Sequence, residues 1–147
     1  MPGPRLHLRP LRADDDAALD SWFAALSEHS RTQRFFSPTP RLTATTRALL
    51  LAGDGPHRLG VVAEVGHLVG REVVGIAHLA AVGSEVGPET AEVALAVTDA
   101  WQGRGIGRRL LTALAAAARS AGYQQLLAYA LESWRIQGHH PYEELAA

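Results

Sequence analysis

The chain has 147 residues, 47% of them hydrophobic, with a formal net charge of -1 at pH 7, which predicts one domain over residues 1–147 that buries its own core. The near-neutral charge gives no attraction toward nucleic acid, and the absence of cysteine excludes disulfides and thiolate chemistry. No apolar run reaches the ~18 residues of a membrane span and the N-terminus has no signal-peptide core, so we expect a cytoplasmic protein without a membrane partner.

The first third of the chain predicts one strand and two helices. Residues 5–11 alternate between apolar and polar side chains, as a strand does, and an acidic run at residues 14–16 favours a helix start. We expect no metal at this acidic run, because adjacent helical positions point in different directions. Residues 30–41 are polar and bounded by prolines, which predicts a loop. Thr43 is placed to cap a second, short helix that ends at Leu51.

The rest of the chain alternates strand and helix patterns. Residues 58–65 and 72–82 are alternating, β-branched runs that predict an antiparallel pair, and residues 91–98 predict another strand. A helix is expected over residues 105–121 and a last strand over residues 124–131. The order β-α-α-β-β-β-α-β predicts an α/β fold with a mixed, mostly antiparallel central sheet and flanking helices.

A turn rich in glycine joins the strand at residues 91–98 to the following helix. It reads Gln102-Gly103-Arg104-Gly105-Ile106-Gly107. The first N–H groups of a helix have no partner within the helix, and together with the macrodipole they favour an anion. Glycine lets a phosphate come close to the backbone. The turn therefore predicts a ligand that carries phosphate.

The spacing of the glycines separates the known phosphate turns. A P-loop needs lysine, and all 14 basic residues of this chain are arginine. A dinucleotide fingerprint needs G-x-G-x-x-G after the first strand, whereas G-x-G-x-G stands late in this chain. The pattern Q-x-x-G-x-G, filled by Gln102, Gly105 and Gly107, resembles the coenzyme A pyrophosphate loop of the GCN5-related N-acetyltransferases.

The resemblance covers residues 5–131. The segment 91–94, the turn at Asp99, and Ser30-Arg31 with Arg34-Phe35-Phe36 are similar to the branch that acetylates protein lysines. This resemblance implies the fold of the family, acetyl-CoA as cosubstrate and no metal. It also implies a set of residues that contact coenzyme A, which comprises Val97, Gln102, Gly103, Arg104, Gly105, Ile106, Gly107 and Arg108.

Acetyl transfer to an amine benefits from a general base, because a lysine amine with a reference pKa near ~10.4 arrives as an ammonium ion. The resemblance places a catalytic glutamate early in the strand before the glycine turn, which makes Glu92 the candidate. Regular alternation would put Glu92 on one face with Ala94 and Ala96, whose small side chains leave room for a substrate. A β-bulge would change this face, and a solvated carboxylate without a catalytic role is the other interpretation.

The C-terminal part departs from the family. Trp134 stands where the family has an asparagine, and residues 135–144 show no strand pattern, so we expect an atypical tail at 132–147 with missing or altered strands. The general acid stays unassigned, with Tyr129 and Tyr142 as available phenols. An uncovered edge at residues 124–131 would favour a homodimer, and the tail folding back over this edge is the alternative.

Three functions stay open. The first is an N-acetyltransferase that acts on protein lysine, and the second keeps this chemistry but acetylates a small amine such as a polyamine or a drug. The third is a module that binds acyl-CoA without turnover, which the altered tail favours.

Overall fold

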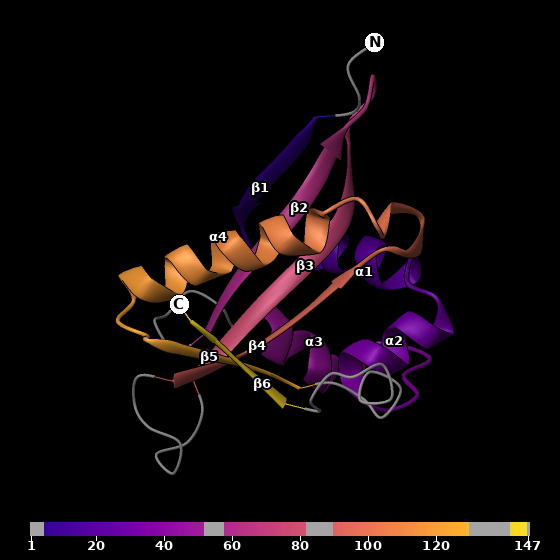
Figure 1. Cartoon of the computed structure of the whole chain (residues 1–147). Coiled ribbons are helices and arrows are strands. Elements are labelled where there is room, and N and C mark those ends of the chain that lie inside the picture. Colours follow the sequence, from indigo (N-terminus) through magenta and orange to yellow (C-terminus); the bar gives the residue numbers. More distant parts are fainter. Residues whose placement is uncertain (1–4, 52–57, 82–89, 130–141, 147) are drawn as a thin grey trace.

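The computed structural model describes residues 5–51, 58–81, 90–129 and 142–146 (Figure 1). Six strands form one sheet in the order β1-β2-β3-β4-β5-β6, and all neighbours are antiparallel except β4 and β5, which are parallel. The strands are β1 (Leu6–Pro10), β2 (Arg58–Gly66), β3 (Arg71–Ala81), β4 (Thr90–Val97), β5 (Gln125–Tyr129) and β6 (Tyr142–Ala146). The helices are α1 (Asp16–Ala24), α2 (Glu28–Phe35), α3 (Ala44–Leu51), the 3-10 turn η1 (Asp99–Trp101) and α4 (Ile106–Ser120).

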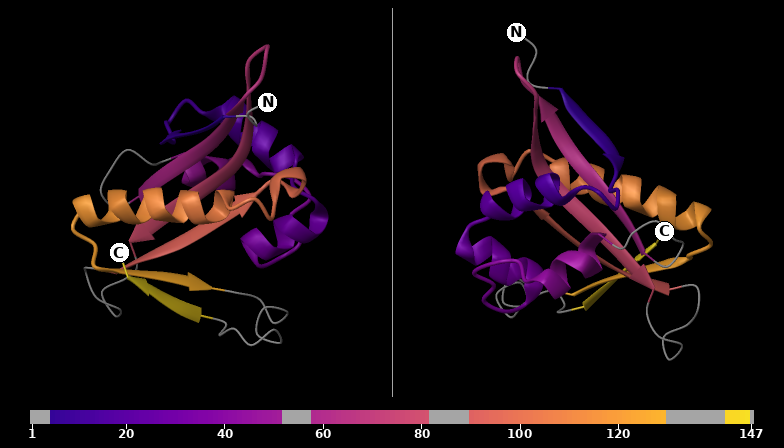
Figure 2. Two further views of the ribbon diagram at one scale, coloured as in Figure 1. Left: turned by 45° about the horizontal axis from the view of Figure 1, so that its top comes forward. Right: turned by 180° about the vertical axis from the view of Figure 1, so that it is seen from behind.

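Helices cover the sheet on both faces. Helix α4 lies on one face, and α1, α2 and α3 lie on the other (Figure 2). The alternation of the strands explains this, since alternate side chains of β2 enter two different hydrophobic clusters. Val61 and Val65 pack toward α4, while Val62 packs with Trp22 of α1. The mixed α/β fold that the sequence predicts is therefore confirmed.

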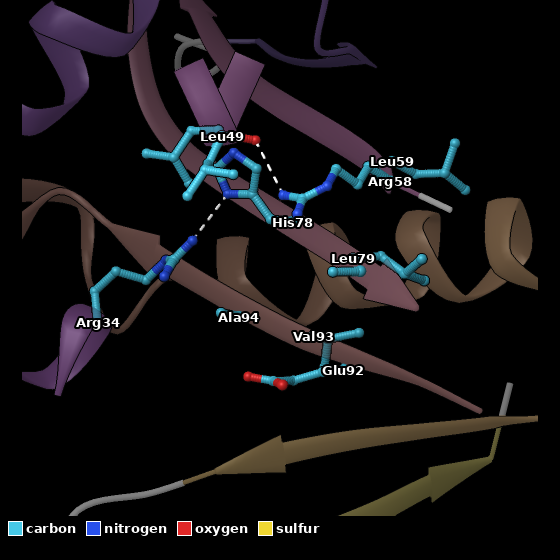
Figure 3. Close-up of a pocket in the computed structure, with 11 residues that line it drawn as sticks. Arg34, Leu49, Arg58, Leu59, His78, Leu79, Glu92, Val93 and Ala94 are labelled. Atoms are coloured by element: carbon cyan, nitrogen blue, oxygen red, sulfur yellow. Dashed lines mark hydrogen bonds between the residues drawn. The ribbon is translucent and has the colours of Figure 1, made fainter. Parts of the chain in front are cut away.

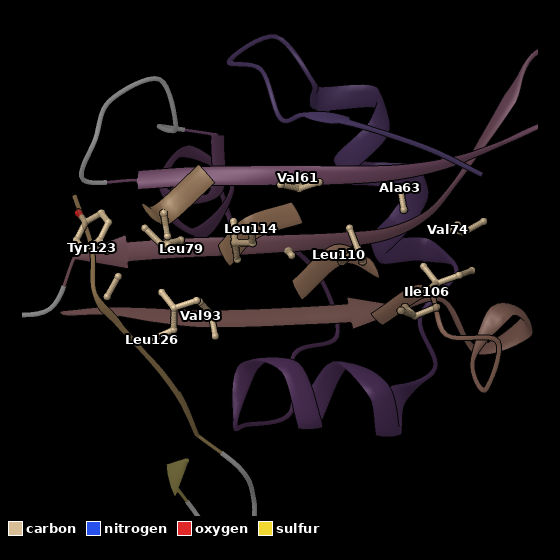
Figure 4. Packing of buried hydrophobic residues seen from close by; sticks show 14 of the residues in the cluster. Val61, Ala63, Val74, Leu79, Val93, Ile106, Leu110, Leu114, Tyr123 and Leu126 are labelled. Atoms are coloured by element: carbon tan, nitrogen blue, oxygen red, sulfur yellow. The ribbon is translucent and has the colours of Figure 1, made fainter. Parts of the chain in front are cut away.

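Helix α4 packs through the stripe Ile106, Leu110, Leu114 and Ala118, whose side chains are at most 6% exposed (Figure 4). Residues four apart lie above one another on a helix, so a single stripe buries the whole face. The stripe comes very close to β3 at Gly75, where a Cβ atom would lie 2.8 Å from Leu110 Cδ1. A larger residue at this position would therefore force the buried Leu110 side chain to move.

Residues 30–41 do not form the loop that the sequence predicts throughout, because α2 occupies Glu28–Phe35. Ser27 is its N-cap and accepts a hydrogen bond from the backbone N–H of Ser30 at 3.1 Å. Phe36, in the left-handed conformation with φ 61°, ends the helix. The sequence of α2 is polar and has no apolar residues at helical spacing, so the pattern did not indicate a helix. Thr43 does cap α3, as predicted, with its Oγ1 accepting from the Thr46 N–H at 3.1 Å.

The C-terminal tail is altered rather than without strands. The sequence shows no strand pattern over residues 135–144, yet β6 at Tyr142–Ala146 pairs antiparallel with β5 from Gln125 to Tyr129. Pairing with an available edge determines this strand, whose own sequence lacks alternation. The outer edge of β5 is thus covered within the chain, which corrects the premise of the predicted homodimer. Trp134, which stands where the family has an asparagine, lies outside the described residues.

None of the helices in the described part of the chain has the length and apolar character needed to cross a membrane.

Candidate active site

The candidate site begins where β4 and β5 separate. Their parallel pairing ends at Val93 and Ala128, whereas the pairing of β4 with β3 continues to Val97. The Thr98 N–H donates to the Val74 carbonyl of β3 at 2.8 Å. Because the direction of backbone groups alternates in an antiparallel ladder, the N–H groups of Leu95 and Val97 point away from β3. They face the opening between β4 and β5, where an extended ligand can form hydrogen bonds.

The glycine turn follows directly after this opening. Gly103 and Gly105 have φ angles of 76° and 80°, a conformation that glycine adopts without the cost that a Cβ atom brings. Arg109 N–H donates to the Gly105 carbonyl at 3.2 Å, so the N–H groups of Ile106, Gly107 and Arg108 precede the first hydrogen-bonded turn of α4. The predicted helix start is therefore present, with its backbone donors ahead of the first turn.

The arginines around the turn differ in how they are held. The Arg104 guanidinium lies 4.6 Å from the centre of the Trp101 ring, and the Trp101 Nε1–H donates to Glu72 of β3 at 3.1 Å. Arg104 is thus placed by an aromatic ring that the sheet itself fixes. Arg108 and Arg109 are exposed at the helix start. All three guanidinium groups add positive charge at the end of α4 that already favours anions.

Gln102 joins two elements of the site. Its Nε2–H donates to the Val97 carbonyl at 2.9 Å and to the Ser30 hydroxyl of α2 at 3.2 Å. The Gln102 amide therefore has partners within the chain and holds the end of β4 against α2. Together with Ser30 and Val97, Gln102 borders a groove of about 330 Å³ between the two elements. The remaining lining residues of this groove are His29, Gln33, Arg34, Leu95 and Ala96.

Glu92 lies on the other side of Arg34, in a second cavity of about 180 Å³ (Figure 3). The register between β3 and β4 runs without a shift from Ala91 to Val97, so Glu92, Ala94 and Ala96 share one face, as the alternation predicts. This face points toward α2 and α3. The assignment of Glu92 as the general base stays a prediction.

Two side chains of this cavity were not predicted from the sequence as site residues. Arg34 Nη2 donates to His78 Nδ1 at 3.0 Å, which joins α2 to β3. Burial, followed by the positive charge of Arg34, lowers the pKa of His78 to about 3. Burial also lowers the pKa of Arg34 to about 10, although the negative charge of Glu92 raises it. At neutral pH the cavity therefore holds a charged guanidinium beside a neutral imidazole.

The sequence gave different indications for Arg34 and His78. Arg34 belongs to the Arg34-Phe35-Phe36 segment that carries part of the resemblance, but nothing local shows which way it points. His78 occupies a strand position among small and apolar residues and faces the cavity only because of the strand register. The side chains of Tyr129 and Tyr142, the two phenols available as a general acid, lie outside what the structure describes.

A family model with the description Acetyltransferase (GNAT) family matches residues 19–146 of this chain. The chain belongs to this family. Membership confirms the family predicted from the glycine turn, and with it the enzyme class, an N-acetyltransferase that uses acetyl-CoA. Within the described residues, no cluster of three metal-ligating side chains is present.

Solved structures of GNAT proteins share the architecture. The GNAT domain of S. lividans PAT is 32% identical, with a TM-score of 0.79, and the match covers 90% of this chain and 76% of that one. The yncA protein of Salmonella typhimurium, a putative acetyltransferase solved with acetyl-CoA, is 24% identical, with a TM-score of 0.67 and coverage of 92% and 76%. A phosphinothricin acetyltransferase from Sinorhizobium meliloti in complex with acetyl-CoA is 19% identical, with a TM-score of 0.68 and coverage of 90% and 69%. The last two likenesses concern the fold.

Proposed function

We propose that this GNAT protein transfers the acetyl group of acetyl-CoA to the side-chain amine of a protein lysine, with Glu92 as the general base. The observation that carries the proposal is the position of Glu92 on β4. Its side chain lines the cavity. A few residues further along the same strand, β4 exposes backbone N–H donors at the opening between β4 and β5. Arg34 borders both this cavity and the groove beside Val97, so the two spaces adjoin at one side chain.

In this proposal acetyl-CoA lies along the groove, with its pyrophosphate at the glycine turn. The N–H groups at the start of α4 and the guanidinium of Arg104 bind the phosphate oxygens, since both are donors suited to an anion. The pantetheine arm then extends beside β4, where the backbone groups of Leu95 and Val97 provide hydrogen-bond partners. Gln102 acts on the protein side, where it keeps β4 and α2 at a fixed separation.

The chemical step is a direct attack on the thioester. The amine nitrogen of lysine forms a bond to the carbonyl carbon, and the proton that the amine loses goes to Glu92, directly or through a water molecule. The carbonyl oxygen becomes an oxyanion, which the N–H of Val97 stabilises. The C–S bond then breaks, coenzyme A leaves as the thiolate, and the amide product remains.

The acceptor class rests on the sequence. The segments around residues 30–36 and 91–94 resemble the branch that acetylates protein lysines, and they include Arg34 and Glu92 of the cavity. A cytoplasmic location is part of the proposal, in keeping with a sequence in which no apolar run reaches the ~18 residues of a membrane span.

Mass spectrometry tests the proposal. The purified protein is incubated with acetyl-CoA and proteins of a host lysate, and acetylated lysines are counted against a reaction with the Glu92→Gln variant. We expect specific lysines to gain the mass of one acetyl group with the wild-type enzyme, and far fewer of them in the same time with the variant. Acetyl transfer to small amines of the lysate, with no change in any protein, would contradict the proposed acceptor.

A further inference from the structure

We propose that the cavity beside Glu92 binds an anionic group that the acceptor carries close to its reactive amine, and that Arg34 is the residue that binds this anion. The inference rests on the proposed function, because Glu92 is taken to mark where the amine reacts. It adds a requirement on the substrate, since a bare ammonium is then a poor acceptor and an amine with a neighbouring carboxylate is a good one.

The first argument is the unfilled hydrogen-bonding capacity of Arg34. Its Nη2 is used by His78, but its Nε is buried and has no hydrogen-bond partner among the described residues. Within the same part of the chain, Arg34 forms no ion pair with a carboxylate. A buried guanidinium N–H without an acceptor destabilises the protein. A carboxylate that binds there removes this cost, because its two oxygens match the planar fork of guanidinium donors.

The second argument is that the guanidinium is held in place. Arg34 lies over the ring of Phe35 at 4.8 Å, and Phe35 itself packs on Trp22 and Phe23. His78 holds the guanidinium as well, by accepting from Nη2 at 3.0 Å. A guanidinium has no acceptor, so His78 must be the neutral tautomer with a free lone pair on Nδ1. Arg34 is therefore a fixed cation supported by a neutral side chain, which leaves its charge available to a ligand.

The third argument is the charge balance of the cavity. Its described lining contains the cations Arg34 and Arg58, the anion Glu92 and the neutral His78, so positive charge exceeds negative by one. Figure 3 shows Arg34 extending from α2 and Glu92 from β4, two different elements that border the cavity. A polyamine would bring further positive charge into this space. An acceptor that combines an amine with an anion places the amine at Glu92 and the anion at Arg34, with complementary charge at both points.

The carboxylate that Arg34 would bind can come from two kinds of acceptor. A carboxylate next to the amine is supplied by an acidic side chain that flanks the lysine in a protein, or by a free amino acid that carries its own carboxylate. The anion requirement is the same in both cases. Acceptors of the two kinds are therefore compared within one experiment.

The experiment measures kcat/KM for matched acceptors with saturating acetyl-CoA. Two peptides differ only in a Glu or a Gln beside the single lysine, and free lysine and glutamate stand for the second source. For the wild type we expect the Glu peptide to be preferred by about tenfold, since a hydrogen bond to a charged group has a net value above that of a neutral one. In Arg34→Met the preference should fall to about onefold, and in Arg34→Lys it should be intermediate.

Arg119→Gln is the matched control. It removes an arginine from the last turn of α4, on the face of the sheet away from the cavity, and should keep the wild-type preference. Equal kcat/KM for the Glu and Gln peptides in the wild type would overturn the inference, even if Arg34→Met fails to fold. A preference that survives in Arg34→Met would overturn the role of Arg34.

The outcomes for the two proposals are distinct. Acetylation of both peptides without a preference leaves the proposed function intact and contradicts only the anion requirement. Acetylation of free amino acids but of neither peptide supports the anion requirement and contradicts the protein acceptor. Acetylation of a polyamine in preference to every anionic acceptor contradicts the inference.

Discussion

The carboxylate of Asp99 accepts two hydrogen bonds from Ser27, one from the backbone N–H and one from the hydroxyl, both at 2.8 Å. The two residues are separated by 72 positions in the sequence, and their contact ties the start of α2 to the turn after β4. Asp99 also accepts from the Ser30 hydroxyl at 3.1 Å. The helix that carries Arg34 is therefore attached to the segment that leads into the glycine turn.

Replacing Asp99 with Asn should destabilise the protein by about 1–2 kcal/mol at pH 7, because an amide cannot accept all of these hydrogen bonds. Burial raises the pKa of the Asp99 carboxyl, but the hydrogen bonds from Ser27 and Ser30 outweigh it and hold the pKa below its ordinary value. A lowered folded-state pKa stabilises the protein above the unfolded value of ~3.9, and this stabilisation is lost as the pH falls through the folded-state pKa.

Urea unfolding of wild type and Asp99→Asn between pH 7 and pH 3 measures this. The difference between the two proteins should be largest near neutral pH and should shrink below about pH 3.9. Asp14→Asn, at an exposed aspartate, is the charge-matched control and should unfold like the wild type. A difference that stays constant across this pH range would show that the charge of Asp99 has no part in the contact.

His78 predicts a second pH dependence, at higher pH. Its pKa in the folded protein is about 3, whereas an unfolded histidine has a pKa of ~6.5. Between these values only the unfolded chain binds the proton, so the folded state loses stability as the pH falls below ~6.5. Between pH 7 and pH 5 this histidine alone should remove up to about 2 kcal/mol. The urea midpoint of His78→Gln should lack this part of the dependence, and His7→Gln should retain it.

Gly105→Ala should weaken coenzyme A binding. The added Cβ would meet no protein atom within 4 Å, so its effect in the free protein is limited to the strain of a φ of 80°. That strain costs about 1–2 kcal/mol in stability. In the complex the methyl group would stand where the pyrophosphate has to approach the backbone.

Gly70→Ala separates these two effects. Gly70 has nearly the same φ, 79°, and an equally open Cβ position, but it lies in the hairpin between β2 and β3. Both variants should lose similar stability, and only Gly105→Ala should lose affinity in calorimetry with coenzyme A. Unchanged coenzyme A affinity in Gly105→Ala would contradict the assignment of the pyrophosphate site to this turn.

Glu92→Gln should lower kcat by ~10²–10⁴-fold with little change in acetyl-CoA affinity. The substitution removes the group that takes the proton and leaves the helix start untouched. Stopped assays with a lysine peptide give kcat, and calorimetry gives the affinity. Since the amine loses its own proton as the pH rises, the deficit should be smaller at pH 10 than at pH 7. Full activity across this range would exclude Glu92 as the base.

The sequence was sufficient where a pattern repeats with the period of the element. The stripe from Ile106 to Ala118 places α4 correctly, and the alternation in β4 puts Glu92 on the face where the structure has it. The glycine turn was equally clear, since the positive φ angles of Gly103 and Gly105 need that residue type. These features depend only on residues close together in the chain.

The features that the sequence did not predict depend on contacts between distant residues. Helix α2 has a polar sequence without a helical period. Asp99, which accepts from its capping residue Ser27, follows α2 in the sequence only after the three strands β2, β3 and β4. Strand β6 exists because β5 offers it an edge. Arg34 and His78 are 44 positions apart, so their contact follows from the packing of α2 against the sheet and from no local pattern.

Because the pairing of β4 with β5 ends at Val93, the last residues of β4 have backbone groups on that side without a partner strand, although β4 lies in the middle of the sheet. A molecule whose amide groups are spaced along an extended arm fills such an edge as an added strand does, so that cofactor binding completes a sheet that the chain leaves unfinished. Amide hydrogen exchange makes this visible one residue at a time. The N–H groups of Leu95 and Val97, which face the opening, should become protected when coenzyme A binds, while the N–H of Ala96, directed at β3, should be protected already in the free protein.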